Sequence, residues 1–299
     1  MENIEQERHS GLKLTIILLY IFAFGALTVL GSEGDIKLNM DNMNIINMLK
    51  IAQAVAVILI FILPAVLFAT LWTKQRIHYL GFTVKTSVST ILIAGIGMLL
   101  AMPMINWLSD INQQMHLPSA FSGIEAWMKH SEDEAAQLTD AFTKGTSIGT
   151  LILNLFVIAF MAAVSEEIFF RGMLQKVLIE CTKNKHVGIW IGAALFSAFH
   201  MQFFGFVPRI LMGAYLGYMF QWSGSLLPGM IAHFINNGVA VYLAWLENRG
   251  AISTDADKIG VENNQWIYVI LSTVMVILSL ILVYKKEKKK TSEIINTSF

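Results

Sequence analysis

Residues 147–170 read SIGTLILNLFVIAFMAAVSEEIFF, and Arg171 follows directly. This stretch is almost wholly apolar. As a helix that rises about 1.5 Å per residue, it is long enough to cross about 30 Å of hydrocarbon. Near its end it carries two adjacent carboxylates, Glu166 and Glu167. Charged groups at membrane depth are costly and mark function by default. The stretch therefore predicts a membrane-spanning helix that carries chemistry.

The rest of the chain has the composition of a polytopic helical membrane protein. Of its 299 residues, 55% are hydrophobic and only 14% are charged, and long uncharged runs recur along its length. Taking about 20 apolar residues for each span, we expect eight transmembrane helices, at 14–31, 51–72, 87–108, 147–170, 188–206, 208–222, 225–246 and 266–284. The predicted fold class is all-α, an eight-helix membrane bundle.

The charge balance and the cysteine content limit the classes of partner. The 21 basic and 21 acidic residues cancel, so the chain offers no basic face that could neutralise the phosphates of a nucleic acid. The single cysteine, Cys181, excludes an internal disulfide framework and a cysteine-rich metal site. We expect the lipid bilayer as a partner, and no nucleic acid.

The orientation follows from where basic residues collect beside the expected spans. The three basic groups are Lys74, Arg76 and Lys85; then Arg171, Lys176, Lys183 and Lys185; then Lys285, Lys286, Lys288, Lys289 and Lys290. All three fall on the cytoplasmic side if both termini are cytoplasmic, and we expect the chain in a bacterial cell membrane. The loops 109–146 and 247–265 then lie outside. In the first loop, Ser131 and Glu134 have capping-box spacing, which predicts a surface helix over 132–142.

We divide the chain into three parts. Residues 1–146 hold N-terminal transmembrane helices and the outer loop, 147–246 form the catalytic core, and 247–299 form the last transmembrane helix with a basic cytoplasmic tail. Within the core, Gly213 and Gly217 are four residues apart, a spacing that lets helix backbones approach closely in lipid. This face can serve inside the bundle or between subunits.

The paired glutamates have separate expected roles. Residues four apart are neighbours on a helix, so Glu167 and Arg171 can form an ion pair in the favourable order. Glu166 lies about 100° around the helix from Glu167 and can face a different element. A carboxylate in a partly dry cavity suits a general base that takes a proton from water and later returns it. The alternative is that both glutamates only hold helices together.

Two further polar pairs occur in equally apolar segments. His200 follows Phe196 by four residues, and Asn237 follows His233 by four, so each pair lies on one helix face. A single histidine in such a helix usually serves as an interhelical hydrogen-bonding group. Two histidines and a glutamate at similar depth favour catalysis instead.

Two mechanisms fit these side chains. In the first, Glu166 and His200 activate a water, and His233 and Asn237 donate hydrogen bonds to the oxyanion formed on a peptide carbonyl. In the second, His200, His233 and Glu166 bind zinc and leave one position open for water. The chain lacks His-Glu-x-x-His, the strongest local zinc signal, and Asn237 is a poor zinc ligand. We favour the first mechanism, which requires no cofactor, and keep zinc as the alternative.

The ordered set of motifs resembles the CPBP family, the CAAX protease and bacteriocin-processing proteases also called Abi, which includes the Ras-converting CAAX endopeptidase. The resemblance covers about residues 147–240. It rests on Glu166-Glu167-x-x-x-Arg171, Phe196-x-x-x-His200 and His233-x-x-x-Asn237, with Arg209, Gly213, Gly217 and the segment 225–228 between them. It implies an eight-helix bundle around an intramembrane catalytic cavity. The implied catalytic residues are Glu166, His200, His233 and Asn237, supported by Glu167, Arg171 and Phe196.

The resemblance also implies an activity. We expect an endopeptidase that cleaves membrane-bound peptide or protein substrates, of CAAX type or bacteriocin and signalling peptides, in a cavity that opens to the cytoplasmic side. The first alternative is a non-catalytic scaffold or immunity protein that regulates a partner membrane protein. The second is a small transporter that uses the buried charges as an ion relay. The family is commonly described as metalloproteases, although a glutamate-dependent mechanism has been argued for its CAAX branch.

Overall fold

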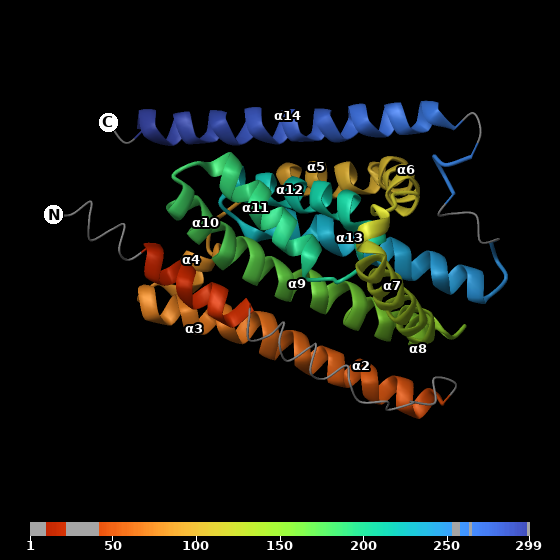
Figure 1. Ribbon diagram of the computed structural model, residues 1–299. Coiled ribbons are helices and arrows are strands. Elements are labelled where there is room, and N and C mark those ends of the chain that lie inside the picture. Colours follow the sequence, from red (N-terminus) through yellow and green to blue (C-terminus); the bar gives the residue numbers. More distant parts are fainter. Residues whose placement is uncertain (1–9, 22–41, 253–257, 263–264, 298–299) are drawn as a thin grey trace.

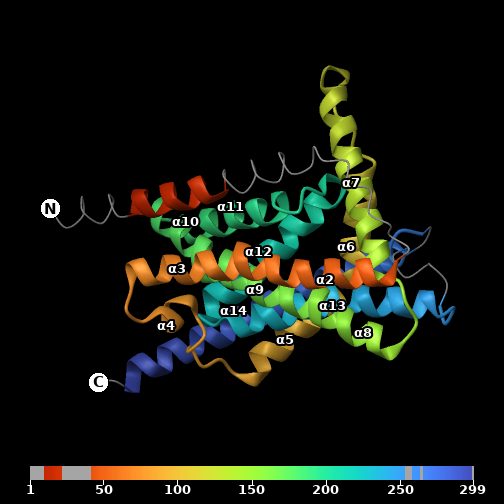
Figure 2. The same cartoon turned by 90° about the horizontal axis from the view of Figure 1, so that it is seen from below.

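The computed structural model describes residues 10–21, 42–252, 258–262 and 265–297. Every regular element in these ranges is helical, which confirms the all-α class for this part of the chain. Figure 1 and Figure 2 show most of the long helices side by side in a bundle. The elements are the helix Ser10–Ile21, then α2 (Met43–Val57), η1 (Ile58–Ile62), α3 (Leu63–Trp72), α4 (Arg76–Leu80), α5 (Val88–Leu100), α6 (Met102–Gln113), η2 (Ser119–Phe121), α7 (Ser122–Thr143), α8 (Ile148–Asn154), η3 (Leu155–Met161), α9 (Ala162–Glu167), η4 (Ile168–Leu174), α10 (Gln175–Thr182), α11 (Lys185–Ala198), η5 (Phe203–Gly205), α12 (Phe206–Ser223), α13 (Leu226–Asn248) and α14 (Trp266–Thr297).

Five helical stretches within these ranges are long and apolar enough to cross a membrane. They are Met43–Trp72, Ile148–Thr182, Phe203–Ser223, Leu226–Asn248 and Trp266–Lys290. The pair α5 and α6, bent by 44° at the break between them, makes a sixth if it forms one span. The chain therefore has membrane-spanning helices, but the predicted number of eight is not confirmed.

With α5 and α6 taken as one span, two of the eight expected spans account for the difference. The span expected at 188–206 is helix α11, which has 14 residues and a length of about 21 Å, short of the roughly 30 Å of hydrocarbon. The apolar run continues past its end, but the backbone turns there, with Met201 at a left-handed φ of 54°. Hydropathy does not distinguish a long helix from two helices joined by an apolar turn. The span expected at 14–31 is described only as far as Ile21, and residues 22–31 lie outside the described residues.

The basic groups gather at one end of the bundle. Figure 1 shows the start of the helix Ser10–Ile21 and the end of α14 on the same side as α4, the end of α3 and the end of α10. Lys290 Nζ donates to the carbonyl of Lys85 at 2.6 Å, and Lys13 Nζ contacts Glu180 Oε2 at 2.7 Å. These contacts join segments that the basic-residue rule placed on one side. Which side of the membrane this basic end faces stays a prediction.

Helix α7 is longer than the surface helix predicted over 132–142. It begins at Ser122 and ends at Thr143, so the supposed cap Ser131 lies inside the helix and the capping-box prediction is wrong. Glu125 in its first turn favours the earlier start, because acidic side chains stabilise helix N-termini. Figure 2 shows α7 crossing the direction of the bundle and projecting from it. Its Trp127 ring lies 5.3 Å from that of Phe203, so α7 packs on the loop between α11 and α12.

Helices α10, α11 and α12 approach closely where their sequences carry glycine. A Cβ on Gly213 would lie 3.1 Å from Ala193 Cα, and one on Gly217 would lie 2.7 Å from Gln175 Oε1. Both glycines therefore face neighbouring helices of the same chain. The close packing predicted from their spacing is confirmed, and it lies inside the bundle.

Gly188 gives a direct test of this packing. A Cβ there would lie 2.8 Å from Ile179 N and 2.9 Å from Ile179 Cα, and backbone atoms of α10 cannot move aside locally. We expect Gly188→Ala to lower the free energy of unfolding by about 1–3 kcal/mol, measured as the unfolding midpoint in detergent. Gly123→Ala on α7 is the matched control, because nothing lies within 4 Å of its added Cβ. It should leave stability unchanged or raise it by up to about 1 kcal/mol. Equal midpoints for the two variants would contradict the prediction.

Candidate active site

The two glutamates lie at the junction of α9 and the π-helical segment η4. Glu166 and Glu167 are the last two residues of α9. Wider turns of this kind occur often at functional sites. The side chain of Glu167 is fully buried, and that of Glu166 is 12% exposed. The glutamate pair thus lies inside the bundle, as expected for a site at membrane depth.

The predicted ion pair between Glu167 and Arg171 is present. Arg171 Nη1 lies 2.6 Å from Glu167 Oε1, and both side chains are buried. Arg171 Nη2 also donates to the carbonyl of Gly213 at 3.0 Å. One turn later, Gln175 Nε2 donates to the carbonyl of Gly217 at 3.0 Å. The missing side chains of the two glycines bring their carbonyls within reach, and these hydrogen bonds tie the glutamate helix to α12.

Glu166 faces two imidazoles from other elements. Its Oε2 lies 3.8 Å from Nε2 of His233, on α13, and 3.9 Å from Nε2 of His200, just after α11. These distances are too long for direct hydrogen bonds. A single water beside Glu166 Oε2 can bridge the carboxylate and an imidazole nitrogen. No hydrogen-bond partner reaches Oε2 from the described part of the chain. A buried polar atom without a partner is costly, so this oxygen is free to accept from a water or a substrate.

The other ring nitrogens fix both histidines. His200 Nδ1 lies 2.9 Å from the carbonyl of Phe196. A carbonyl only accepts, so Nδ1 carries the proton and the neutral ring keeps a lone pair on Nε2. His233 Nδ1 lies 3.1 Å from Glu167 Oε1, and this contact orients the second ring. Glu167 therefore contacts Arg171 and His233 together, and it positions the imidazole that faces Glu166.

Phe196 forms the packing centre of the cluster. Its ring lies 4.6 Å from the guanidinium carbon of Arg171, 5.0 Å from the ring of His200 and 5.7 Å from the ring of His233. Phe196 is fully buried. A rigid aromatic ring between the cation and both imidazoles limits their rotamers. It fits the supporting role that the resemblance implies.

Asn237 lies one helical turn beyond His233, away from the imidazole contacts. Its Nδ2 donates to the carbonyl of Ile158 at 3.5 Å, and its Oδ1 accepts from Asn236 Nδ2 at 3.1 Å. The first hydrogen bond is at the long limit of such contacts. Of the four predicted catalytic residues, Glu166, His200 and His233 thus converge, and Asn237 is adjacent with a loosely engaged amide.

Two neighbours of the cluster were not among the predicted site residues. A Cβ on Gly229 would lie 2.9 Å from Glu167 Oε2, so only glycine leaves room for this carboxylate against α13. Gln175 repeats the contact of Arg171 one turn later. The spacing of Gln175 from Arg171 was a usable sequence signal, because polar residues four apart share a helix face. Gly229 offered no such signal.

The predicted zinc ligands, His200, His233 and Glu166, are of the right chemical type. Two imidazoles and a carboxylate are a set that catalytic zinc uses. Within the ranges that the structure describes, however, no three His, Cys, Asp or Glu side chains come together in a way that could hold a metal ion. Zinc binding by these three residues therefore stays a prediction.

The segment that holds this cluster matches a known family. Residues 148–239 match the family model described as "Type II CAAX prenyl endopeptidase Rce1-like". This segment is Rce1-like, which confirms the predicted resemblance to the CPBP and CAAX proteases. The chain is also 30% identical over 92 residues to the "Uncharacterized protein YpbD" of Bacillus subtilis (strain 168), a match that covers 29% of this chain and 44% of that protein. The alignment thus spans less than half of the relative. No solved structure matches the chain.

Proposed function

We propose that this protein is an intramembrane endopeptidase in which Glu166 activates a water molecule. The observation that carries the proposal is the buried, unpartnered Oε2 of Glu166, which lies within 3.9 Å of two imidazole nitrogens. A carboxylate held for an ion pair alone would contact its cation. Arg171 is already paired with Glu167. Glu166 is therefore available as a general base, and the Rce1-like match supports hydrolysis of a peptide bond.

The proposed reaction uses this geometry in two steps. Glu166 takes a proton from a water that also contacts His200 Nε2, while the water oxygen bonds to the peptide carbonyl carbon. The electron pair of the C=O bond moves to oxygen, and His233 in its protonated form and Asn237 donate to this oxyanion. The intermediate then collapses. The C–N bond breaks, the proton from Glu166 passes to the leaving nitrogen, and a carboxylic acid and an amine result.

The burial pattern bears on how a substrate reaches the site. His200 is the accessible member, with 30% of its side chain exposed, against 2% for His233. It lies on the loop that packs against α7, remote from the basic end of the bundle (Figure 2). This burial pattern favours entry of the substrate near α7. The sequence analysis expected entry from the cytoplasmic side, which the basic residues predict to be the opposite end of the bundle. We propose membrane-bound peptides as substrates, with CAAX-type, bacteriocin and signalling peptides as the classes to test.

Cleavage by metal-free protein tests this proposal. Purified protein in lipid vesicles is treated with a chelator and incubated with a panel of fluorogenic membrane peptides, and the products are identified by mass spectrometry. Vesicles prepared without the protein control for contaminating proteases. We expect cleavage to continue at an unchanged rate after chelation. Loss of cleavage on chelation and its recovery with added zinc would overturn the water-only mechanism. No cleavage of any peptide would favour the scaffold alternative.

A further inference from the structure

Arg209 is a partly buried cation in the first turn of α12, and within the described residues its hydrogen bonds go to the neutral residue Gln202. Its Nη1 donates to the carbonyl of Gln202 at 3.0 Å, and its Nη2 donates to Gln202 Oε1 at 3.0 Å. A Cβ on Gly205 would lie 2.9 Å from Nη2, so the absence of a side chain there makes room for the guanidinium. Arginines within membrane segments normally pair with an anion or line a polar cavity. Among the described residues, two of the five donors of Arg209 have a partner, which leaves three for a ligand.

The guanidinium borders a cavity of about 170 Å³ between α6, α12 and α13. Its polar lining consists of Arg209, Ser109 and Asn236. On two helices, α12 and α13, residues that line this cavity lie within one turn of residues that belong to or contact the glutamate cluster. On α12, Gly213 follows Arg209 by four residues and accepts from Arg171. On α13, Asn236 donates to Asn237, the proposed oxyanion donor. Arg209 also interacts electrostatically with Glu166.

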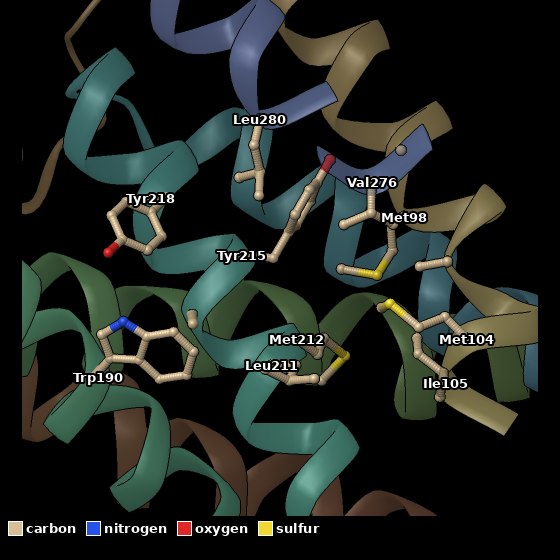
Figure 3. A pocket seen from close by; sticks show the side chains of 13 residues that line it. Met98, Met104, Ile105, Trp190, Leu211, Met212, Tyr215, Tyr218, Val276 and Leu280 are labelled. Atoms are coloured by element: carbon tan, nitrogen blue, oxygen red, sulfur yellow. The ribbon is translucent and has the colours of Figure 1, made fainter. Parts of the chain in front are cut away.

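A second, apolar cavity adjoins this polar one. It measures about 220 Å³, lies between α5, α6, α11, α12 and α14, and shares the walls Ile105 and Met212 with the polar cavity. Figure 3 shows Met98, Met104 and Met212 along it. Methionine side chains are flexible and adapt to apolar groups of different shape. The two cavities together match a ligand that carries an anionic group beside an apolar side chain.

We infer that Arg209 binds a carboxylate of the substrate, with the neighbouring apolar side chain in the methionine-lined cavity. Arginine suits this role because its planar donors match a carboxylate in pairs. The carboxylate is either the C-terminus of the peptide or an acidic side chain near the cleaved bond. The inference rests on the proposed function, because the ligand is taken to be the peptide substrate. Its test measures binding and does not require that the protein cleaves a peptide. Glu132 on α7 interacts electrostatically with Arg209, and its carboxylate accepts from the N–H of Phe204 at 3.3 Å.

Binding of three matched probes tests this inference without requiring cleavage. The probes are a fluorescent apolar tetrapeptide with a free C-terminal carboxylate, the same peptide as its amide, and an amide with one aspartate. Affinities are measured on the full-length protein in detergent. We expect one carboxylate probe to bind about 10- to 100-fold more tightly than the neutral amide, the range for hydrogen bonds to a charged group. Which carboxylate probe binds tightly identifies the source.

Variants assign the preference to Arg209. Arg209→Gln should reduce the difference between the probes to less than about threefold, and Arg209→Lys should keep part of it. Arg249→Gln is the matched control, because Arg249 lies at the far end of α13 over the Trp245 ring, and it should keep the full preference. Thermal unfolding checks that each variant folds. Equal binding of all three probes by the unmodified protein would overturn the inference, even if the protein cleaves peptides. So would a full preference in Arg209→Lys and Arg209→Gln alike.

Discussion

Replacing Glu166 with glutamine is expected to lower the rate of peptide cleavage by about 10²- to 10⁴-fold, the range for loss of a general base. Glutamine has nearly the same shape as glutamate but cannot take a proton from water. Its amide can still occupy the space beside His200 and His233. Because Oε2 of Glu166 has no hydrogen-bond partner within the described residues, the change removes no structural contact from that oxygen. The loss should appear in kcat, with little change in the unfolding midpoint.

A control on the same helical stretch separates chemistry from general damage. Glu180 lies on α10 and pairs with Lys13 near the basic end. Glu180→Gln should keep full activity, because the pair lies far along the helix from the cluster. Full activity of Glu166→Gln would sink the general-base role. A Glu166→Gln protein that is inactive but also unfolded would leave chemistry and stability unseparated, so the unfolding midpoint is measured for each preparation.

Replacing Arg171 with methionine is expected to cause the largest loss of stability, about 3–5 kcal/mol. Methionine fills a similar length of chain but leaves Glu167 buried without its cation. The carboxylate keeps its contact with His233 at 3.1 Å, and α12 loses the hydrogen bond from Arg171 to the carbonyl of Gly213. The measurement is the free energy of unfolding in detergent, followed with increasing denaturant.

The double variant isolates the buried charge as the cause. Glu167→Gln in the Arg171→Met background removes the unpaired carboxylate and should restore part of the lost stability, so the two changes are not additive. If the double variant is less stable than Arg171→Met by the full cost of Glu167→Gln alone, the ion pair is not the source of the loss. Packing of Arg171 on Phe196 would then carry most of the stability.

The sequence predicts which side chains of the candidate site share a face of one helix, because this depends only on local helix geometry. Residues four apart share a face, so the contact between Glu167 and Arg171 followed from their spacing. The same rule put Phe196 beside His200 and gave Glu166 a different direction from Glu167. The three residues Glu166, His200 and His233 do converge, although their roles in catalysis stay a proposal.

Features that depend on where separate segments meet could not be predicted from residue spacing. The adjacent polar cavity needs α6, α12 and α13 together, and Gly229 matters only because Glu167 lies against it. Asn237 shares a face with His233, yet its amide meets the backbone of Ile158. Hydropathy also counted α11 as a span, because it records apolar composition and not where a chain turns.

The sequence by itself determined that this protein is an all-helical membrane protein with charged groups at depth, because apolar run length and the helical period are local properties. The order of three motifs also predicted the resemblance to the CAAX proteases that the match over residues 148–239 confirms. Only the tertiary structure decided that α11 ends short of a full span, that Glu167 supports His233 while Oε2 of Glu166 has no partner among the described residues, and that Arg209 borders a cavity. These depend on contacts between distant segments, such as His233 with Glu167, 66 residues apart, and packing between such segments is not encoded in any single window of the chain.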